Sequence, residues 1–275
     1  KKVSRGNQVW QYENSLNTIF GNLAEIDPNL FLEALNLNFT KFNFNLNLTY
    51  IFNRFFQKAP QLYFELYNLI GGLNENTKFC FHQTINIDNV NEEHLLLLYS
   101  DLLDSIKSLK SQYVFWDLTF ASKYKALKEE KEIYSEILEI ALSKIKTEQV
   151  KISVGQNFIE KCFSFNNFSN ETLIEAYLYS NDIEEHFDYE KKLLKTLLIH
   201  DSNVLIRLLK FNSPNRISYH DLEHENFDFI WELENYIEII DSIFEFYISS
   251  ESYYFSENAV ASFFSPSRDK HGNKP

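Results

Sequence analysis

The chain has 275 residues, of which 44% are hydrophobic and 16% aromatic, and its formal net charge is −13. This length and apolar content are enough to bury a substantial core, which excludes a disordered chain. The acidic charge argues against nucleic acid and anionic membrane surfaces as partners. Because no apolar run approaches the roughly 18 to 20 residues that span a bilayer, and the N-terminus lacks the apolar core of a signal peptide, we expect a cytoplasmic protein.

Apolar residues at helical spacing and helix-start signals predict helices along most of the chain. Asp27-Pro28, for example, combines an N-cap with a proline at the first helical position, and Ser169 and Asp201 stand in capping positions. Short links between the helices imply antiparallel neighbours. The predicted helices span residues 8–23, 28–37, 48–57, 61–70, 92–109, 112–127, 129–145, 150–165, 171–179, 183–199, 203–211, 227–250 and 256–264.

Two stretches depart from this pattern. Apolar and polar residues alternate strictly over 36–47, which predicts either a half-buried strand or a loop leading into the next helix. Residues 73–90 are the least helical stretch, with 78–87 extended, and they are expected to be an irregular linker or loop. We therefore divide the chain into an N-terminal helical part (1–72), this linker (73–90), a helical array (91–264) and a disordered tail (265–275).

About a dozen helices of this length are typical of an all-α protein, either an α-solenoid-like array or an irregular helical array. No repeat of fixed period is present, so tetratricopeptide and ankyrin signatures are not supported. The six glycines form neither a phosphate loop nor a dinucleotide-binding turn. Cys80 and Cys162 lie far apart among phenylalanines and are expected to be core residues, so we predict no metal and no cofactor. The chain contains no methionine, which suggests a piece of a longer protein.

The stretch 227–250 combines helical periodicity with one-sided charge. No lysine or arginine occurs from Ile217 to Phe264, against eleven acids. Spacings of four, three and four residues place a row of carboxylates on one helix face, which is either simply solvated or directed at a basic partner. The predicted buried face consists of Leu233, Tyr236, Ile237, Ile240, Phe244 and Tyr247, and the acidic face of Glu234, Glu238, Asp241 and Glu245.

Histidines supply the remaining candidates for chemistry. His200-Asp201 follows three apolar residues and matches one end of the HD phosphohydrolase motif, although Asp201 also reads as a helix cap. His220 and His224 have the four-residue spacing of a zinc pair but stand in a loop-like run, where exposed loop histidines are the default. Arg216 lies in the same loop, residues 215–226.

The run from Phe229 to Ile240, FIWELENYIEII, and the loop before it resemble the C-terminal helical regions of large bacterial STAND-type (NACHT-type) NTPases of antiphage defence. The resemblance covers residues 191–250. In that family an N-terminal effector and a central NTPase precede a helical array that binds a phage protein and releases the enzyme from its resting state. Since this chain has no phosphate loop, the resemblance implies that it is the sensing part or an isolated helical subunit.

The sequence thus predicts a protein-recognition module without catalysis of its own, which senses a phage protein. One alternative is an acidic immunity or inhibitor protein that blocks a basic nuclease or toxin. A second alternative is an HD-like metal phosphohydrolase. Trp231 is expected in the core more readily than at an interface, although Trp and Tyr are the anchors enriched where an interface exists. Oligomerisation is left open. The predicted partner-binding residues are Trp231, Glu234, Glu238, Asp241, Glu245, Arg216, His220 and His224.

Overall fold

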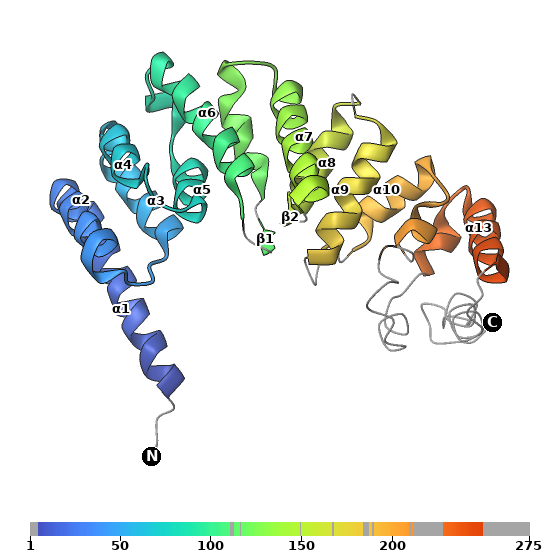
Figure 1. The fold of residues 1–275 in the computed structure, drawn as a ribbon, viewed down its shortest axis with the longest axis horizontal. Helices are drawn as coiled ribbons and strands as arrows, with labels where there is room; N and C mark the ends of the chain where they lie inside the picture. The colour runs from blue at the N-terminus through green and yellow to red at the C-terminus, as the bar shows by residue number, and fades with distance from the viewer. Residues whose placement is uncertain are drawn as a thin grey trace. The chain divides into compact units, whose positions relative to one another are not determined.

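The computed structural model describes residues 5–110, 113–115, 117–148, 150–166, 168–183, 187–188, 190–208, 211 and 228–249, and of residues 5–11, 113–115, 228 and 247–249 the backbone alone. The fold is an all-α helical array, as expected (Figure 1). It divides into two compact units. Unit 1 comprises Lys1–Ser111 and Thr119–Val150, and unit 2 comprises Gln112–Leu118 and Lys151–Pro275. In the expected division residues 73–90 are a linker between two helical parts, whereas in this division they lie within unit 1.

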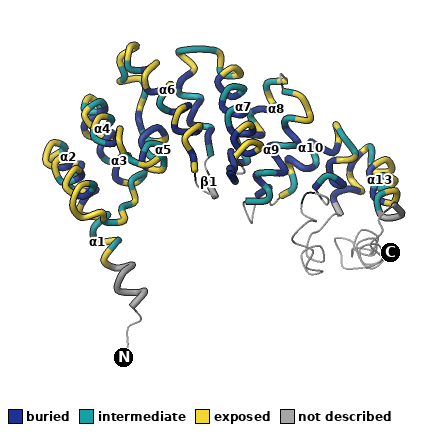
Figure 2. The backbone as a smooth tube through the Cα atoms, viewed as in Figure 1, coloured by how far each residue is buried: buried dark blue, intermediate teal, exposed yellow. Residues whose placement is uncertain are grey.

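Unit 1 is built from helices stacked in rows. One row runs α1, α3, α5, α6 and α7, each packed on the next, while α2 contacts α1 and α4, and α4 also packs on α5. Buried residues lie where these helices face one another (Figure 2). The helices are α1 (Arg5–Ile26), α2 (Pro28–Leu37), α3 (Leu48–Lys58), α4 (Tyr63–Ile70), α5 (Glu75–Thr84), α6 (Glu92–Ser108) and α7 (Glu130–Glu148), joined by the short segments η1 (Asn38–Phe42), η2 (Pro60–Leu62), η3 (Ile87–Asn89) and η4 (Leu118–Ala126).

Side-chain caps fix where these helices begin. The Asp27 carboxylate accepts the Leu30 N–H at 3.1 Å, which confirms the predicted cap of α2. Asn47 and Asn74 cap α3 and α5 in the same way, through a side-chain oxygen that accepts a backbone N–H three residues later. The chain therefore starts each of these helices at a residue that satisfies an otherwise unpaired donor.

Neither stretch that broke the helical pattern in the sequence forms a strand. Over 36–47 the helix α2 continues into the π-helical turn η1, and Asn38, which is buried, bonds both backbone groups of Phe44 through its side chain. The loop alternative is thus confirmed for 43–47, and the strand alternative is wrong. Residues 78–87, expected to be extended, lie largely in α5, because Phe79, Phe81 and the ring of His82 are buried against neighbouring helices.

Close packing of α1 on α3 depends on a glycine. A Cβ at Gly21 would come within 2.9 Å of the Tyr50 ring and 3.1 Å of the Arg54 side chain. Gly21 therefore allows the two helices to approach, at the usual cost of about 1 kcal/mol for a glycine inside a helix.

Unit 2 contains the only two strands that the described residues form. β1 (Tyr113–Phe115) and β2 (Lys151–Ser153) pair in parallel, with Val114 opposite Ile152. The predicted helices over 112–127 and 150–165 are therefore wrong at their N-terminal ends, since the strand pairing satisfies backbone groups that a helix would have paired internally. The remaining elements are α8 (Gln156–Ser164), α9 (Asn170–Ile183), α10 (Lys192–His200), η5 (Asp228–Glu232) and α13 (Tyr236–Ser249).

The predicted helix over 183–199 is wrong in its N-terminal half, since α9 ends at Ile183 and α10 begins only at Lys192. Asp188 has a left-handed backbone conformation and is fully buried, and its carboxylate accepts the N–H groups of Leu193 and Leu194 at 3.1 and 2.8 Å. Because these bonds cap the start of α10, the chain must turn before that helix begins. As predicted, Ser169 caps α9 through the Thr172 N–H at 3.1 Å.

None of the helices in the described part of the chain has both the length and the apolar content needed to cross a membrane.

The C-terminal end of α5 has a cap that comes from a distant segment. Lys123 of η4 donates to three backbone acceptors, the carbonyl oxygens of His82, Gln83 and Ile85, at 3.4, 2.5 and 3.0 Å. Burial lowers the pKa of Lys123 to about 8, so the ammonium is still charged at neutral pH. A cation at this position also complements the helix dipole.

We expect Lys123→Met to lower the free energy of unfolding by about 1–3 kcal/mol, because buried carbonyl groups at the end of α5 lose their donor. Lys125→Met is the matched control, since Lys125 is exposed on the same segment, and it should change stability by less than about 0.5 kcal/mol. Denaturant unfolding followed by circular dichroism measures both values. Equal effects of the two substitutions would contradict the capping role.

Candidate functional site

Of the residues predicted to bind a partner, Trp231 lies on η5, Glu234 in the turn after it, and the other three acids on α13. Arg216, His220 and His224 lie outside the described residues. The expected continuous helix over 227–250 is wrong. The chain turns between η5 and α13, where Asn235 donates its side-chain amide to the carbonyl oxygen of Leu198 on α10 at 2.7 Å. This bond connects the start of α13 to α10.

The apolar residues that are buried in this region are not the same set that the sequence pattern predicts. Leu233, Ile239 and Ile243 are buried, together with Phe229 and Ile230 of η5. The prediction that Tyr236, Ile237 and Phe244 lie on the buried face is wrong, because they are 36%, 58% and 38% exposed. The reason is the turn before α13, which sets the rotation of the helix so that Ile239 and Ile243 point inward. Of Tyr247 the structure describes only the backbone.

Trp231 is exposed, contrary to its expected place in the core. Its side chain is 49% exposed, and its ring lies 5.8 Å from that of Tyr236, centroid to centroid. Next to it, Lys195 of α10 contacts η5 twice, lying 5.4 Å from the Phe229 ring and 3.4 Å from the Glu232 carboxylate. Buried apolar side chains and contacts from α10 thus hold the segment that presents Trp231.

The four predicted acids are all exposed on the same region. None of them forms an ion pair within the described part of the chain. On α13, Ile237 and Phe244 are seven residues apart and form a strip beside the acidic row. We call this combined region the α13 surface; it consists of Trp231, Tyr236, Ile237, Phe244, Glu234, Glu238, Asp241 and Glu245.

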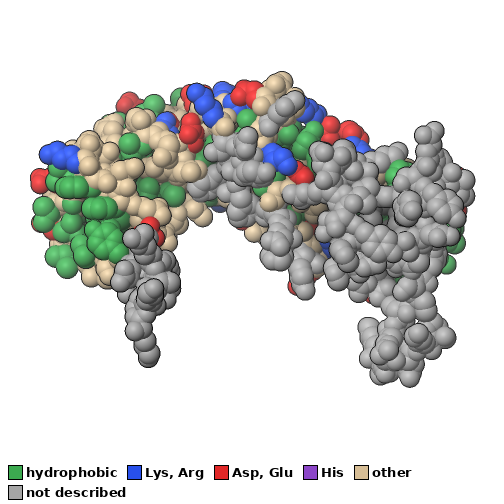
Figure 3. Space-filling view, turned by 60° about the horizontal axis from the view of Figure 1, so that its bottom comes forward, with side chains coloured by type: hydrophobic (Ala, Val, Ile, Leu, Met, Phe, Trp, Pro, Cys, Tyr) green, Lys and Arg blue, Asp and Glu red, His purple; other side chains and the backbone are tan. Residues whose placement is uncertain are grey.

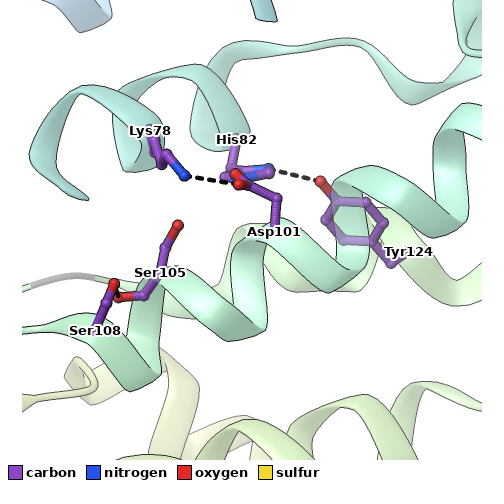
Figure 4. Close-up of polar contacts among 6 residues, drawn as sticks. All are labelled: Lys78, His82, Asp101, Ser105, Ser108 and Tyr124. Carbon is purple, nitrogen blue, oxygen red and sulfur yellow. Dashed lines mark hydrogen bonds and ion pairs between the residues drawn. The ribbon is translucent and has the colours of Figure 1, made fainter. Parts of the chain in front are cut away.

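A group of polar side chains, which the sequence pattern did not reveal, lies in the interior of unit 1 (Figure 4). The His82 ring is fully buried between α5, α6 and η4. Its Nε2 atom lies 3.2 Å from a carboxylate oxygen of Asp101, and its Nδ1 atom lies 2.8 Å from the Tyr124 hydroxyl. Lys78 donates to the other oxygen of Asp101 at 2.7 Å. The signal that could have found this group is the four-residue spacing of Lys78 and His82, but it is informative only if 75–84 is read as a helix.

The surroundings of this buried group set its charge states. Burial lowers the pKa of His82 against the opposing effect of Asp101, so the imidazole is neutral in the folded protein at neutral pH. His82 and Lys78 hold the pKa of Asp101 below its usual value in spite of burial. Burial raises the pKa of Tyr124 well above its usual value. A general base must reach the proton it abstracts, whereas both His82 nitrogens are occupied and the ring has no solvent access. This geometry favours a structural role.

His200 and Asp201, which form the HD-like pair, lie in different environments. His200 is exposed at the end of α10, and Asp201 accepts the Asn203 N–H at 2.9 Å, which is the alternative helix-cap role expected for it. Within the parts of the chain that the structure describes, no three or more His, Cys, Asp or Glu residues are grouped so that they could hold a metal ion.

Comparisons with known protein families, with curated proteins and with solved structures give no match for this chain. The chemistry of its surfaces and interior is therefore the basis for a functional proposal.

We expect the stability of the protein to fall as the pH is lowered from about 7 to 5. The unfolded chain protonates His82 near its usual pKa of 6.5, whereas the folded state resists protonation, so the unfolded state binds more protons in this range. The lowered pKa of the Asp101 carboxyl also contributes to stability, and this contribution is lost only at a lower pH, as the pH falls through 3.8 and below. Unfolding free energies measured across this range test the expectation.

Two variants test whether His82 causes the pH dependence of stability. His82→Gln should lower stability at pH 7 by about 1–3 kcal/mol, because it breaks buried hydrogen bonds, and should reduce the slope between pH 7 and 5. His94→Gln, which removes the bond between His94 and the Tyr63 hydroxyl at 2.6 Å, is the control for the loss of a hydrogen-bonded histidine side chain. A slope that survives in His82→Gln would assign the acid sensitivity to other groups.

Proposed function

We propose that this chain is a protein-recognition module without catalysis of its own, and that it senses a foreign phage protein through the α13 surface. The observation that carries the proposal is the exposed Trp231–Tyr236 pair, at 49% and 36% exposure, beside a row of exposed carboxylates. Large aromatic side chains supply most of the binding energy at protein interfaces, and surrounding charged groups select the partner.

Buried residues and contacts with α10 hold the α13 surface in place, which favours recognition by a preformed surface. Ile239 and Ile243 are at most 1% exposed, so α13 is fixed by its buried side. Asn235 and Lys195 connect α13 and η5 to α10. Because ordering costs are then small on this side of the interface, more of the contact energy is available for affinity. The likeness of residues 229–240 to the sensor regions of STAND-type NTPases supports a phage protein as the partner.

The acidic inhibitor remains the second candidate, and a specific observation favours it. Glu234, Glu238, Asp241 and Glu245 are exposed and form no ion pair among the described residues, so their field is directed at solvent or at a partner. Such a field accelerates association with a basic protein, and salt weakens it.

We expect the purified full chain, once immobilised, to capture a phage-encoded protein from infected bacteria that is absent from uninfected cells. With that protein identified by mass spectrometry and purified, Trp231→Ala should weaken binding at least tenfold, equivalent to about 1.4 kcal/mol. Leu96→Ala is the matched control, because Leu96 is an exposed apolar residue on α6, outside the α13 surface, and binding should be unchanged. A phage protein that binds both variants equally well would contradict a role for the α13 surface.

Salt dependence separates the two candidates. A sensor that binds through its aromatic residues should lose less than about tenfold in association rate between low and physiological salt, whereas an acidic inhibitor should lose more. Changing Glu234, Glu238, Asp241 and Glu245 together to Gln should then slow association with a basic nuclease or toxin. A steep salt dependence that the four substitutions abolish would replace the sensor proposal with the inhibitor.

A further inference from the structure

The N-terminal hairpin of unit 1 exposes an apolar face that the rest of the unit does not cover. Figure 3 shows hydrophobic side chains gathered at the end of the chain that holds α1 and α2. This region, the apolar hairpin face, consists of Tyr12 (56% exposed), Ile19 (59%), Ile26 (80%), Leu30 (49%), Leu37 (42%) and Phe42 (58%). Contiguous exposed apolar patches of this kind mark interaction surfaces.

The face is continuous along both helices of the hairpin. Tyr12 packs edge-on against Phe44, with ring centroids 6.2 Å apart, and Phe44 stacks on Phe42 at 5.5 Å. Ile26 and Leu30 lie at the other end, on either side of the Asp27-Pro28 turn. Since α1 packs on α2, the apolar residues run from the turn to the far end of the hairpin.

The spacing on α1 is that of a helix seam. Tyr12, Leu16, Ile19, Leu23 and Ile26 alternate steps of four and three residues, the pattern with which one helix packs lengthwise against another. Leu16 and Leu23 are half-buried and border the exposed residues. This spacing suits a second helix that packs lengthwise against α1.

Charge on this face favours a second copy of the same chain. A net charge of −13 makes two copies repel each other in general, so they can approach only where charge is low. On α1, from Tyr12 to Ile26, the sequence has no lysine or arginine and two acids, and both acids have partners on other segments. Glu13 accepts the Asn45 amide at 3.4 Å, and Glu25 pairs with Arg54 at 3.4 Å. The rest of the face carries one exposed acid, Glu33, and one exposed base, Lys41, whose charges are opposite.

The area is of the size that a dimer needs. At about 100 Å² each, the six side chains present on the order of 600 Å² of accessible apolar surface. A standard interface buries about 800 Å² per partner, and bordering residues such as Leu16 and Leu23 would supply the difference.

We propose that the apolar hairpin face is covered by the same face of a second copy of this chain. The two α1–α2 hairpins then form a four-helix bundle related by a two-fold axis, in which each copy presents the same patch to the other. This dimer does not involve the α13 surface and does not depend on the proposed sensing function.

Sedimentation equilibrium of the full chain, over about a hundredfold range of concentration, tests the dimer. The wild type should approach twice the chain mass of 32.7 kDa. Ile19→Glu should raise the dimer dissociation constant at least tenfold, because it would bury an unpaired carboxylate in the bundle. Leu96→Glu is the control, since Leu96 is 60% exposed, almost the same as Ile19, but lies outside the face; it should leave the dimer intact.

Far-UV circular dichroism should show the same helix content for both variants. If Ile19→Glu does not fold, Ile26→Glu replaces it, because that side chain is 80% exposed. A wild type that stays monomeric at every concentration overturns the proposal and assigns the face to a different occupant. A dimer that survives Ile19→Glu, or that Leu96→Glu weakens equally, places the contact elsewhere and also overturns it.

Discussion

The requirement that buried backbone groups at helix ends find partners shapes much of this structure. An array of short helices has many ends, and each leaves N–H or C=O groups without an intrahelical partner. The usual C-terminal solution is glycine, yet the chain has only six. At the end of α5 the side chain of Lys123 does this work instead. At helix N-termini, side-chain oxygens accept the N–H groups: those of Asp27, Asn47, Asn74 and the buried Asp188.

The same requirement explains why polar groups lie in the interior of unit 1. Lys123 and Tyr124 are neighbours on η4; one caps α5 and the other bonds His82 near the end of that helix. Asp101 then connects His82 to α6. A network of this kind specifies how three elements meet, because any other register would leave a buried charge or hydrogen-bonding group without a partner.

Two surfaces of contrasting chemistry follow from the way each unit buries its core. The apolar hairpin face has little charge and suits an identical, acidic copy. The α13 surface combines aromatic side chains with carboxylates that form no ion pair among the described residues, and it suits a partner of different composition, since two such surfaces would repel each other. Neither surface contains the buried histidine network, so the residues proposed for recognition are separate from those that connect α5, α6 and η4.

The sequence by itself determined the all-α class, the capped helix starts at Asp27 and Ser169, and the exposure of the acidic row, because spacing and capping are local properties. It failed where distant residues decide the local structure. The π-turn at Asn38, helix α5, the β1–β2 pair and the Asp188 cap each depend on a partner or on burial that only the folded chain supplies. The rotation of α13, and with it the exposure of Trp231 and Ile237, was decided by the Asn235 bond to α10, since an amphipathic pattern with apolar residues on several sides does not specify which of them the rest of the protein will cover.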